Sequence, residues 1–195
     1  LSKIKIDFIT CSAHKFHGPK GVGFVYVKSG TNLLPLIEGG SQERGFRGGT
    51  ESIHNIVGLK AAFQSSYDFL EKDSKKVSKI KEHFINSIQR SIPNIKINGC
   101  PSKNDSSYAI LNICLPVSVE KKTLLNFKLD LAGIACSGGS ACQSGSSKPS
   151  HVLSEILSSA DMKNISLRFS FSKFNSIEEV DYVVDFLKKF VSENN

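Results

Sequence analysis

The stretch CSAHKFHGPKG, residues 11–21, lies between two apolar segments, IKIDFIT (4–10) and VGFVYVK (22–28). Both flanking segments are rich in β-branched and aromatic residues, which favours strands. The stretch between them contains a serine, two histidines and two lysines, together with a proline and two glycines. It therefore predicts a polar connection between two strands, and such connections often carry functional side chains.

The glycines of this connection do not match a nucleotide-binding loop of either common type. Ser12 and His14 are two residues apart, so an extended backbone would direct both side chains to one side, where they could hydrogen-bond an anionic group. Lys15 would then point elsewhere. Two interpretations remain open from the residues alone: a polar loop with a solvated lysine, or a lysine that attacks a carbonyl to form a Schiff base.

The rest of the chain alternates between helical and extended patterns, which places it in the α/β or α+β class. A helix is predicted from about residue 53 to 91, with a break near EKDSKK (71–76). Its apolar stripe recurs at steps of three and four, at Val77, Ile80, Phe84 and Ile88. The glycine-rich EGGSQERGFRGGTES (38–52) before it is predicted to be a loop.

The C-terminal half contains shorter units. Strands are predicted at residues 95–99, 106–116 and 165–173, and helices at 120–133, from Ser150 and from Ile177. Ser176 and Glu179 have the spacing of a capping box at the start of the last helix. The buried stripe of that helix is predicted at Ile177, Val180, Val184, Leu187 and Val191.

The composition excludes several classes of protein. The 195 residues are 39% hydrophobic and 22% charged, as in an ordinary globular protein. The net charge is +7, but the lysines are scattered, which favours a solvated surface over a nucleic-acid-binding face. No apolar stretch approaches the about 20 residues of a membrane span, and residues 1–8 lack the apolar region of a signal peptide.

The five cysteines are an odd number without C-x-x-C spacing, which argues against a disulfide framework and a structural zinc site. Cys142 stands apart because glycines and serines surround it, with Lys148 and His151 nearby. An exposed thiol near cations ionises easily and can act as a nucleophile. Cys136 is the second candidate nucleophile. The alternative is an incidental thiol in a linker.

Arg168 is a cation on the polar face of the predicted strand 165–173, whose other face carries Leu167, Phe169 and Phe171. An arginine in this position suits bidentate binding of a carboxylate. A structural ion pair would explain it equally well.

Four stretches together resemble the cysteine desulfurases, which are pyridoxal-phosphate enzymes of the class V aminotransferase group. They occur in that family's order: SAHKFHGPKGVGFVYV (12–27), GGSQERGFRGGTES (39–52), CSGGSACQSGSSKPSHVL (136–153) and ISLRFSFSKFNSIEEVDYVV (165–184). The resemblance covers nearly the whole chain and is weakest between residues 65 and 105. It implies pyridoxal 5'-phosphate bound covalently by Lys15, with Ser12 and His14 at the phosphate and Thr50 reaching the phosphate of a partner subunit.

The resemblance also implies the chemistry. Arg168 matches the residue that binds the carboxylate of L-cysteine, and Cys142 matches the nucleophile that takes its sulfur as a persulfide and leaves L-alanine. The long loop around Cys142 resembles that of enzymes that pass sulfur to an iron-sulfur scaffold or another acceptor protein. No resident metal is expected, although Cys142 could transiently ligate a cluster shared with a scaffold.

The implied fold is α/β. Residues 1–57 would be the end of a large cofactor-binding domain, and 58–195 a linking helix and an α+β small domain. Family members carry a long segment before the lysine-bearing strand, so the chain is expected to be a C-terminal portion. A homodimer is expected, in the cytoplasm or in a mitochondrion or plastid, with no nucleic-acid or membrane partner. The alternatives are a selenocysteine lyase and a non-catalytic dimerisation or adaptor fragment.

Overall fold

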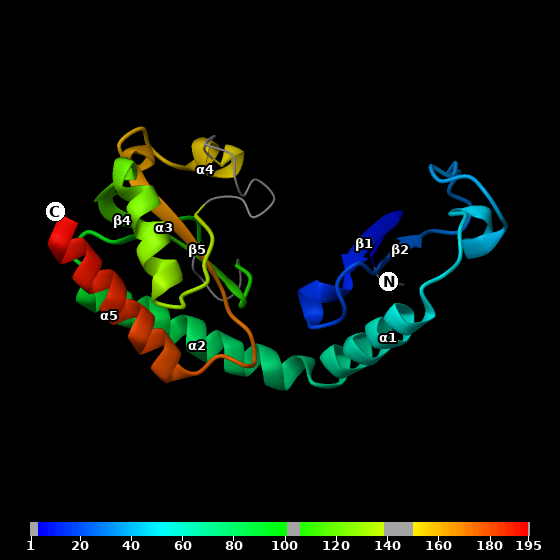
Figure 1. Cartoon of the computed structure of the whole chain (residues 1–195), viewed down its shortest axis with the longest axis horizontal. Helices are drawn as coiled ribbons and strands as arrows, with labels where there is room; N and C mark the ends of the chain where they lie inside the picture. The colour runs from blue at the N-terminus through cyan, green and yellow to red at the C-terminus, as the bar shows by residue number, and fades with distance from the viewer. Residues whose placement is uncertain (1–3, 101–105, 139–149, 195) are drawn as a thin grey trace. The chain divides into compact units, whose positions relative to one another are not determined.

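The computed structural model describes residues 4–100, 106–138 and 150–194 (Figure 1). The chain divides into two compact units, Leu1–Leu70 and Glu71–Asn195, here called unit 1 and unit 2. The elements are a mixture of helices and antiparallel strands. The assignment of residues 1–57 and 58–195 to a large and a small domain stays a prediction.

Unit 1 contains an antiparallel pair of strands, β1 (Phe8–Ser12) and β2 (Gly23–Val27). A 3-10 helix, η1 (Ala13–Phe16), follows β1 directly, and a second one, η2 (Gln42–Gly45), lies in the predicted glycine-rich loop. The helix α1 (Ile53–Asp68) ends the unit. Both predicted strands are confirmed, but β1 begins at Phe8 rather than at residue 4, because its partner strand ends at Val27, opposite Phe8.

The expectation that Ser12 and His14 share one side of an extended segment is wrong. Ser12 has the extended backbone of the last strand residue, whereas His14 already lies in the 3-10 helix η1. Side chains in a 3-10 helix repeat every three residues rather than every two. The two side chains therefore follow different local geometries.

The long predicted helix is in fact two helices. α1 ends at Asp68 and α2 (Leu70–Ser91) begins two residues later, so the break falls at Phe69, just before the predicted position. The predicted stripe of α2 is confirmed, since Val77, Ile80, Phe84 and Ile88 are all buried. The stripe also includes Lys81, which the sequence did not predict to be buried; its ammonium donates to Ser106 Oγ at 2.9 Å and to the Ser107 carbonyl at 2.7 Å.

Unit 2 is built on a three-stranded antiparallel sheet in the order β3-β4-β5, with β3 at Lys96–Ile97, β4 at Ile110–Ser118 and β5 at Asn164–Ser170. One face packs against α2, α3 (Lys122–Leu131) and α5 (Ile177–Asn194), whose buried residues belong to the same core cluster as those of β4 and β5. The short elements η3 (Val119–Lys121), α4 (His151–Ile156) and η5 (Asp161–Lys163) complete the described part of the unit.

Alternation along the strands explains this layer. Leu111, Ile113 and Leu115 of β4 and Leu167 of β5 are buried against the helices, so the residues between them lie on the opposite face of the sheet. That second face carries polar residues, among them Arg168. The capping box of α5 is confirmed: Glu179 N–H donates to Ser176 Oγ at 3.3 Å and Ser176 N–H donates to Glu179 Oε2 at 3.1 Å.

The predicted stripe of α5 is largely correct. Four of its five residues are buried, whereas Ile177, in the first turn, is 36% exposed. Phe190 is a buried residue that the stripe did not include.

Unit 1 differs from unit 2 in the size of its core. Among its described residues, Ala13 is the only apolar side chain that is buried. Large apolar side chains remain exposed on its strands, its loops and α1; Leu36, for example, is 96% exposed.

Candidate cofactor and substrate site

Lys15 lies on η1, which a tight backbone turn holds at the end of the β1–β2 pair. Ala13 N–H donates to the Val22 carbonyl at 3.0 Å, and Gly18 N–H donates to the Ala13 carbonyl at 2.8 Å. Between them His17 adopts a left-handed backbone with φ 67°, which reverses the chain. A Cβ at Gly18 would lie 2.8 Å from Ala13 Cβ, so the turn can pack this closely only with glycine there.

The helix α1 supports this turn from within the same unit. Ser66 Oγ donates to the Phe16 carbonyl at 3.3 Å, and the Phe63 ring makes an edge contact with the Phe16 ring at 6.1 Å between centroids. Gly58 lies against Pro19, since a Cβ at Gly58 would come within 2.6 Å of Pro19 Cγ. These supporting residues were not predicted from the sequence, although a glycine inside a helical pattern is a signal of close packing.

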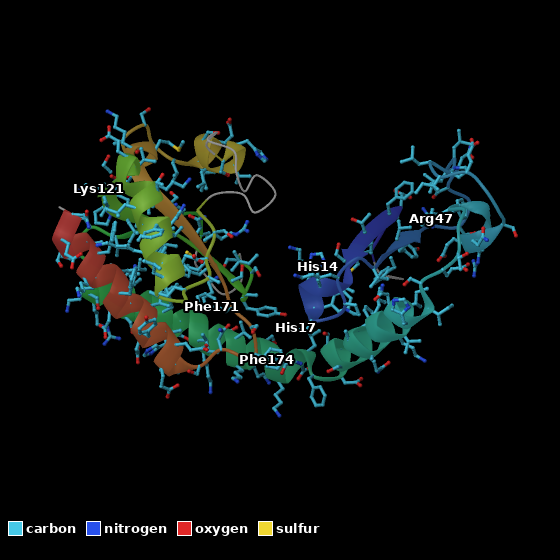
Figure 2. All side chains as sticks on the ribbon, in the orientation of Figure 1. His14, His17, Arg47, Lys121, Phe171 and Phe174 are labelled. Atoms are coloured by element: carbon cyan, nitrogen blue, oxygen red, sulfur yellow. The ribbon has the colours of Figure 1, made fainter. Side chains whose placement is uncertain are left out.

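The three predicted cofactor residues on this turn, Ser12, His14 and Lys15, are all exposed. Among the described residues none of their side chains has a hydrogen-bond or ion-pair partner, and Ser12 does not cap η1. Figure 2 shows the side chain of His14 on η1. A hydroxyl, an imidazole and a primary amine are thus available within four consecutive residues. The hydroxyl and the imidazole can hydrogen-bond a phosphate, and the amine can condense with an aldehyde.

Thr50 lies in the loop before α1 and is exposed. Its loop is fixed by contacts of the preceding glycines: Gly48 N–H donates to the Ile37 carbonyl at 2.9 Å, and Gly49 N–H donates to Gln42 Oε1 at 3.2 Å. A Cβ at Gly48 would approach Gly39 Cα to 2.8 Å, so this crossing of two chain segments requires glycine. No hydrogen bond joins Thr50 to the η1 residues in the described part of unit 1.

Arg168 lies on β5 of unit 2, on the face of the sheet that the helices do not cover. Its guanidinium has no hydrogen-bond or ion-pair partner among the described residues, and its Nε atom is buried without one. A buried donor without an acceptor is costly, which distinguishes Arg168 from an arginine in a structural ion pair. Its backbone pairs with Ser137 through two hydrogen bonds, of 3.0 Å from Ser137 N–H and 2.7 Å from Arg168 N–H.

Cys142, the predicted nucleophile, lies outside the described residues. Cys136, the second candidate, is half-buried and packs against the core of unit 2. Burial raises the pKa of its thiol to about 11, which makes it a poor nucleophile near neutral pH. Burial also raises the pKa of Cys114. No two cysteines of the described residues are joined by a disulfide.

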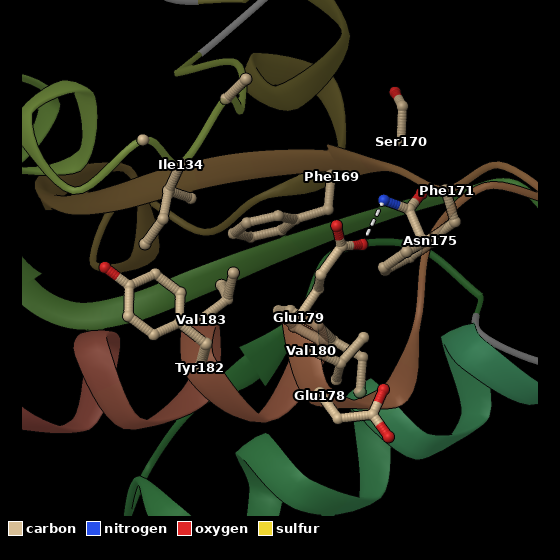
Figure 3. A pocket seen from close by; sticks show the side chains of 13 residues that line it. Ile134, Phe169, Ser170, Phe171, Asn175, Glu178, Glu179, Val180, Tyr182 and Val183 are labelled. Carbon is tan, nitrogen blue, oxygen red and sulfur yellow. Dashed lines mark hydrogen bonds between the residues drawn. The ribbon is translucent and has the colours of Figure 1, made fainter.

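A cavity of about 510 Å³ lies elsewhere in unit 2, at the end of β5 beside α5 (Figure 3). Its lining is largely aromatic and aliphatic, with Glu179 held toward Asn175 by a 3.0 Å hydrogen bond. Arg168 does not line it, although its neighbour Phe169 does. The cavity is therefore distinct from the predicted substrate residue.

The predicted site residues fall into two groups. Ser12, His14, Lys15 and Thr50 belong to unit 1, whereas Arg168 belongs to unit 2. Within the described ranges, no group of three or more histidine, cysteine or acidic side chains could hold a metal ion, and no helix is long and apolar enough to cross a membrane.

Comparison with known families identifies the family of the chain. A family model described as aminotransferase class-V matches residues 1–183. The chain belongs to the aminotransferase class-V family. This result confirms the family resemblance that the four sequence stretches indicated.

Individual proteins similar to this chain are named cysteine desulfurase or NifS-like protein. A protein named cysteine desulfurase IscS from Clostridium botulinum is 39% identical over 99% of this chain, and one from Dictyoglomus turgidum is 34% identical over 99%. The human cysteine desulfurase is 38% identical over 95% of this chain and 40% of its own length. A solved NifS-like protein superposes with a TM-score of 0.83 at 31% identity, covering 99% of this chain and 48% of that one. The chain spans about half the length of the curated relatives it matches, 48% for the two bacterial proteins.

Proposed function

We propose that this chain is part of a pyridoxal-phosphate-dependent cysteine desulfurase, which converts L-cysteine to L-alanine and retains the sulfur as a persulfide on Cys142. The proposal rests mainly on the guanidinium of Arg168. Its guanidinium has no partner among the described residues, and its backbone pairs with Ser137, five residues before Cys142. Five residues span at most about 17 Å, so the sequence separation allows the proposed nucleophile to act beside the proposed carboxylate-binding residue.

The residues of η1 are suited to holding the cofactor. We assign Lys15 to the covalent bond with the cofactor aldehyde and Ser12 and His14 to its phosphate, because these side chains are exposed and have no described partner. Thr50 is assigned to the phosphate bound by a second subunit. When bound, pyridoxal phosphate withdraws electrons from the substrate Cα.

The chain's own residues then have separate tasks. Arg168 binds and orients the carboxylate of L-cysteine through charge-assisted hydrogen bonds. The Lys15 amine takes and returns protons at the substrate carbons as a general base and acid. The Cys142 thiolate forms a bond to the substrate sulfur while the bond from that sulfur to Cβ breaks, and Cβ receives a proton. Atoms balance as L-cysteine plus a thiol giving L-alanine plus a persulfide.

The persulfide requires an acceptor, for which we propose an iron-sulfur scaffold or another sulfur-accepting protein. We further propose a homodimer, in which Thr50 acts across the subunit interface. The compartment would be the cytoplasm, or a mitochondrion or plastid in a eukaryote. These assignments follow from the likeness to proteins named cysteine desulfurase, which extends over nearly all of this chain.

The test is the location of the sulfur. The holoenzyme that contains this chain is incubated with L-cysteine, digested without reductant and searched by mass spectrometry for peptides heavier by roughly 32 Da, one sulfur atom. We expect the adduct on Cys142 in the wild type and in Cys136→Ser, and no adduct in Cys142→Ser, because a hydroxyl cannot replace a thiolate in this step. A persulfide that persists elsewhere in Cys142→Ser would refute the assignment.

A further inference from the structure

Arg168 belongs to a row of four residues that crosses the sheet of unit 2. Ser137 pairs with Arg168, and Arg168 is opposite Asn112 in the β4–β5 register. On the other side of β4, Asn98 N–H donates to the Asn112 carbonyl at 2.9 Å. The row is therefore Ser137, Arg168, Asn112 and Asn98, although these residues are far apart in the sequence.

The hydrogen bonds of this row determine how closely Arg168 and Asn112 approach. Arg168 uses both its N–H and its carbonyl on Ser137, and both groups of a strand residue point to the same side of the strand. Arg168 and Asn112 therefore face each other as a non-hydrogen-bonded pair, the type with the closer side chains. Cβ atoms of directly opposed residues lie about 4.5–5.5 Å apart.

Both side chains lie on the face of the sheet away from the helices. Leu111 and Ile113, the neighbours of Asn112, are buried in the core, as are Leu167 and Phe169, the neighbours of Arg168. Since side chains alternate along a strand, Asn112 and Arg168 share the opposite face. Both are half-buried there.

The amide of Asn112 is held in one orientation by Asn98. Asn98 Nδ2 donates to Asn112 Oδ1 at 2.8 Å and to Ser166 Oγ at 3.1 Å. Because its oxygen is the acceptor in this bond, Asn112 is left with its Nδ2 group as a donor. That group has no partner among the described residues.

Two neighbouring donors therefore lack a protein acceptor within the described part of unit 2. Neither the Arg168 guanidinium nor Asn112 Nδ2 can accept a hydrogen bond, so they cannot satisfy each other. A carboxylate can satisfy both, because its two oxygens offer about four acceptor positions. An anionic ligand bound by Arg168 would thus meet a second donor on the next strand.

We infer that Asn112 is a second binding residue for the substrate carboxylate, and that Asn98 is a positioning residue that orients the Asn112 amide. The inference rests on the proposed function, in which Arg168 binds the carboxylate of L-cysteine. It adds a donor that distinguishes an amino acid from an amine lacking the carboxylate.

The test compares two ligands in the holoenzyme that contains this chain. In a Cys142→Ser background, which prevents sulfur transfer, the Kd of L-cysteine and of cysteamine is measured from the change in cofactor absorbance. Cysteamine has the same amine and thiol but no carboxylate. Asn112→Ala is expected to raise the Kd of L-cysteine about tenfold, the loss of one hydrogen bond to a charged group, and to leave that of cysteamine unchanged.

Further variants separate a binding role from a structural one. Asn112→Asp keeps an acceptor for Asn98 and nearly the same shape but has no N–H donor, so it should weaken L-cysteine at least as much as Asn112→Ala. Asn98→Ala should have a smaller effect of the same kind, because the Asn112 donor remains but is no longer oriented. Asn86→Ala, an exposed position on α2, is the matched control and should change neither Kd.

Each outcome has a distinct meaning. If Arg168→Ala weakens L-cysteine selectively but the Asn112 variants do not, the inference is wrong and the proposed function stands. An Arg168→Ala variant that binds L-cysteine as tightly as its parent would contradict the proposed function itself. If the Asn112 variants lose both ligands equally, Asn112 serves only to hold the sheet, and the inference is again overturned.

Discussion

The thiol of Cys136 is expected to react far more slowly than an ordinary cysteine, and this difference can be calculated. Burial raises its pKa from 9.0 to about 11. Only the thiolate is alkylated, and at pH 8 the thiolate fraction is about 0.1% for a pKa near 11 and about 10% for a pKa near 9. Alkylation of Cys136 should therefore be about 100 times slower than that of an unperturbed thiol.

The assay is timed alkylation of the folded protein with iodoacetamide at pH 8, followed by peptide mass spectrometry. A short peptide with an ordinary cysteine in the same solution provides the reference rate. Raising the pH from 8 to 10 should accelerate Cys136 about 90-fold but the reference only about tenfold, because the reference thiol is already largely ionised at pH 10. In concentrated guanidinium, where burial is lost, the two rates should converge.

A Cys136 labelling rate within about threefold of the reference at pH 8 would refute this reasoning. It would mean that the sulfur is not desolvated by the core of unit 2. Cys136 would then have to be considered again as the residue that accepts the substrate sulfur.

Two further predictions concern single side chains. Borohydride reduction of the holoenzyme should fix the cofactor on the peptide that contains Lys15. Lys15→Ala should lose this label, and Lys20→Ala, in the turn after Pro19, should keep it. A label on Lys20 would contradict the assignment of Lys15. Ser176→Ala should lower the free energy of unfolding by about 1 kcal/mol, since it removes the side-chain acceptor of the α5 cap. Urea denaturation measures this value. An unchanged midpoint would show that the cap contributes nothing to stability.

Local patterns predicted much of the fold correctly. The stripe of α2 and the capping box of α5 depend on residues three and four positions apart, so the sequence contains the relevant information within one or two turns. The first strand was predicted too long because strand length depends on the partner. β1 begins at Phe8, where its pairing with Val27 begins, and nothing within residues 4–7 indicates that limit.

The geometry around Lys15 was less accessible to sequence reasoning. The sequence shows that the connection between β1 and β2 is polar. Its conformation, however, depends on a 3-10 turn after which the chain reverses at His17, and on support from α1, about 50 residues away. Alternation of side chains placed Arg168 on the polar face of its strand. The residues beside it were not predicted, because Asn98 and Asn112 reach Arg168 only through the register of the sheet.

The nearly absent core of unit 1 has a thermodynamic consequence for the face that carries Lys15. With Ala13 as the only buried apolar side chain among its described residues, this unit gains little free energy from internal burial to offset the conformational entropy of its ordered loops. We therefore expect the ordering of this unit to be coupled to burial of its exposed apolar side chains. Such coupled association has a large negative heat-capacity change, so its enthalpy varies steeply with temperature. Any ligand held by the exposed side chains of η1 would accordingly bind in equilibrium with the folding of this unit.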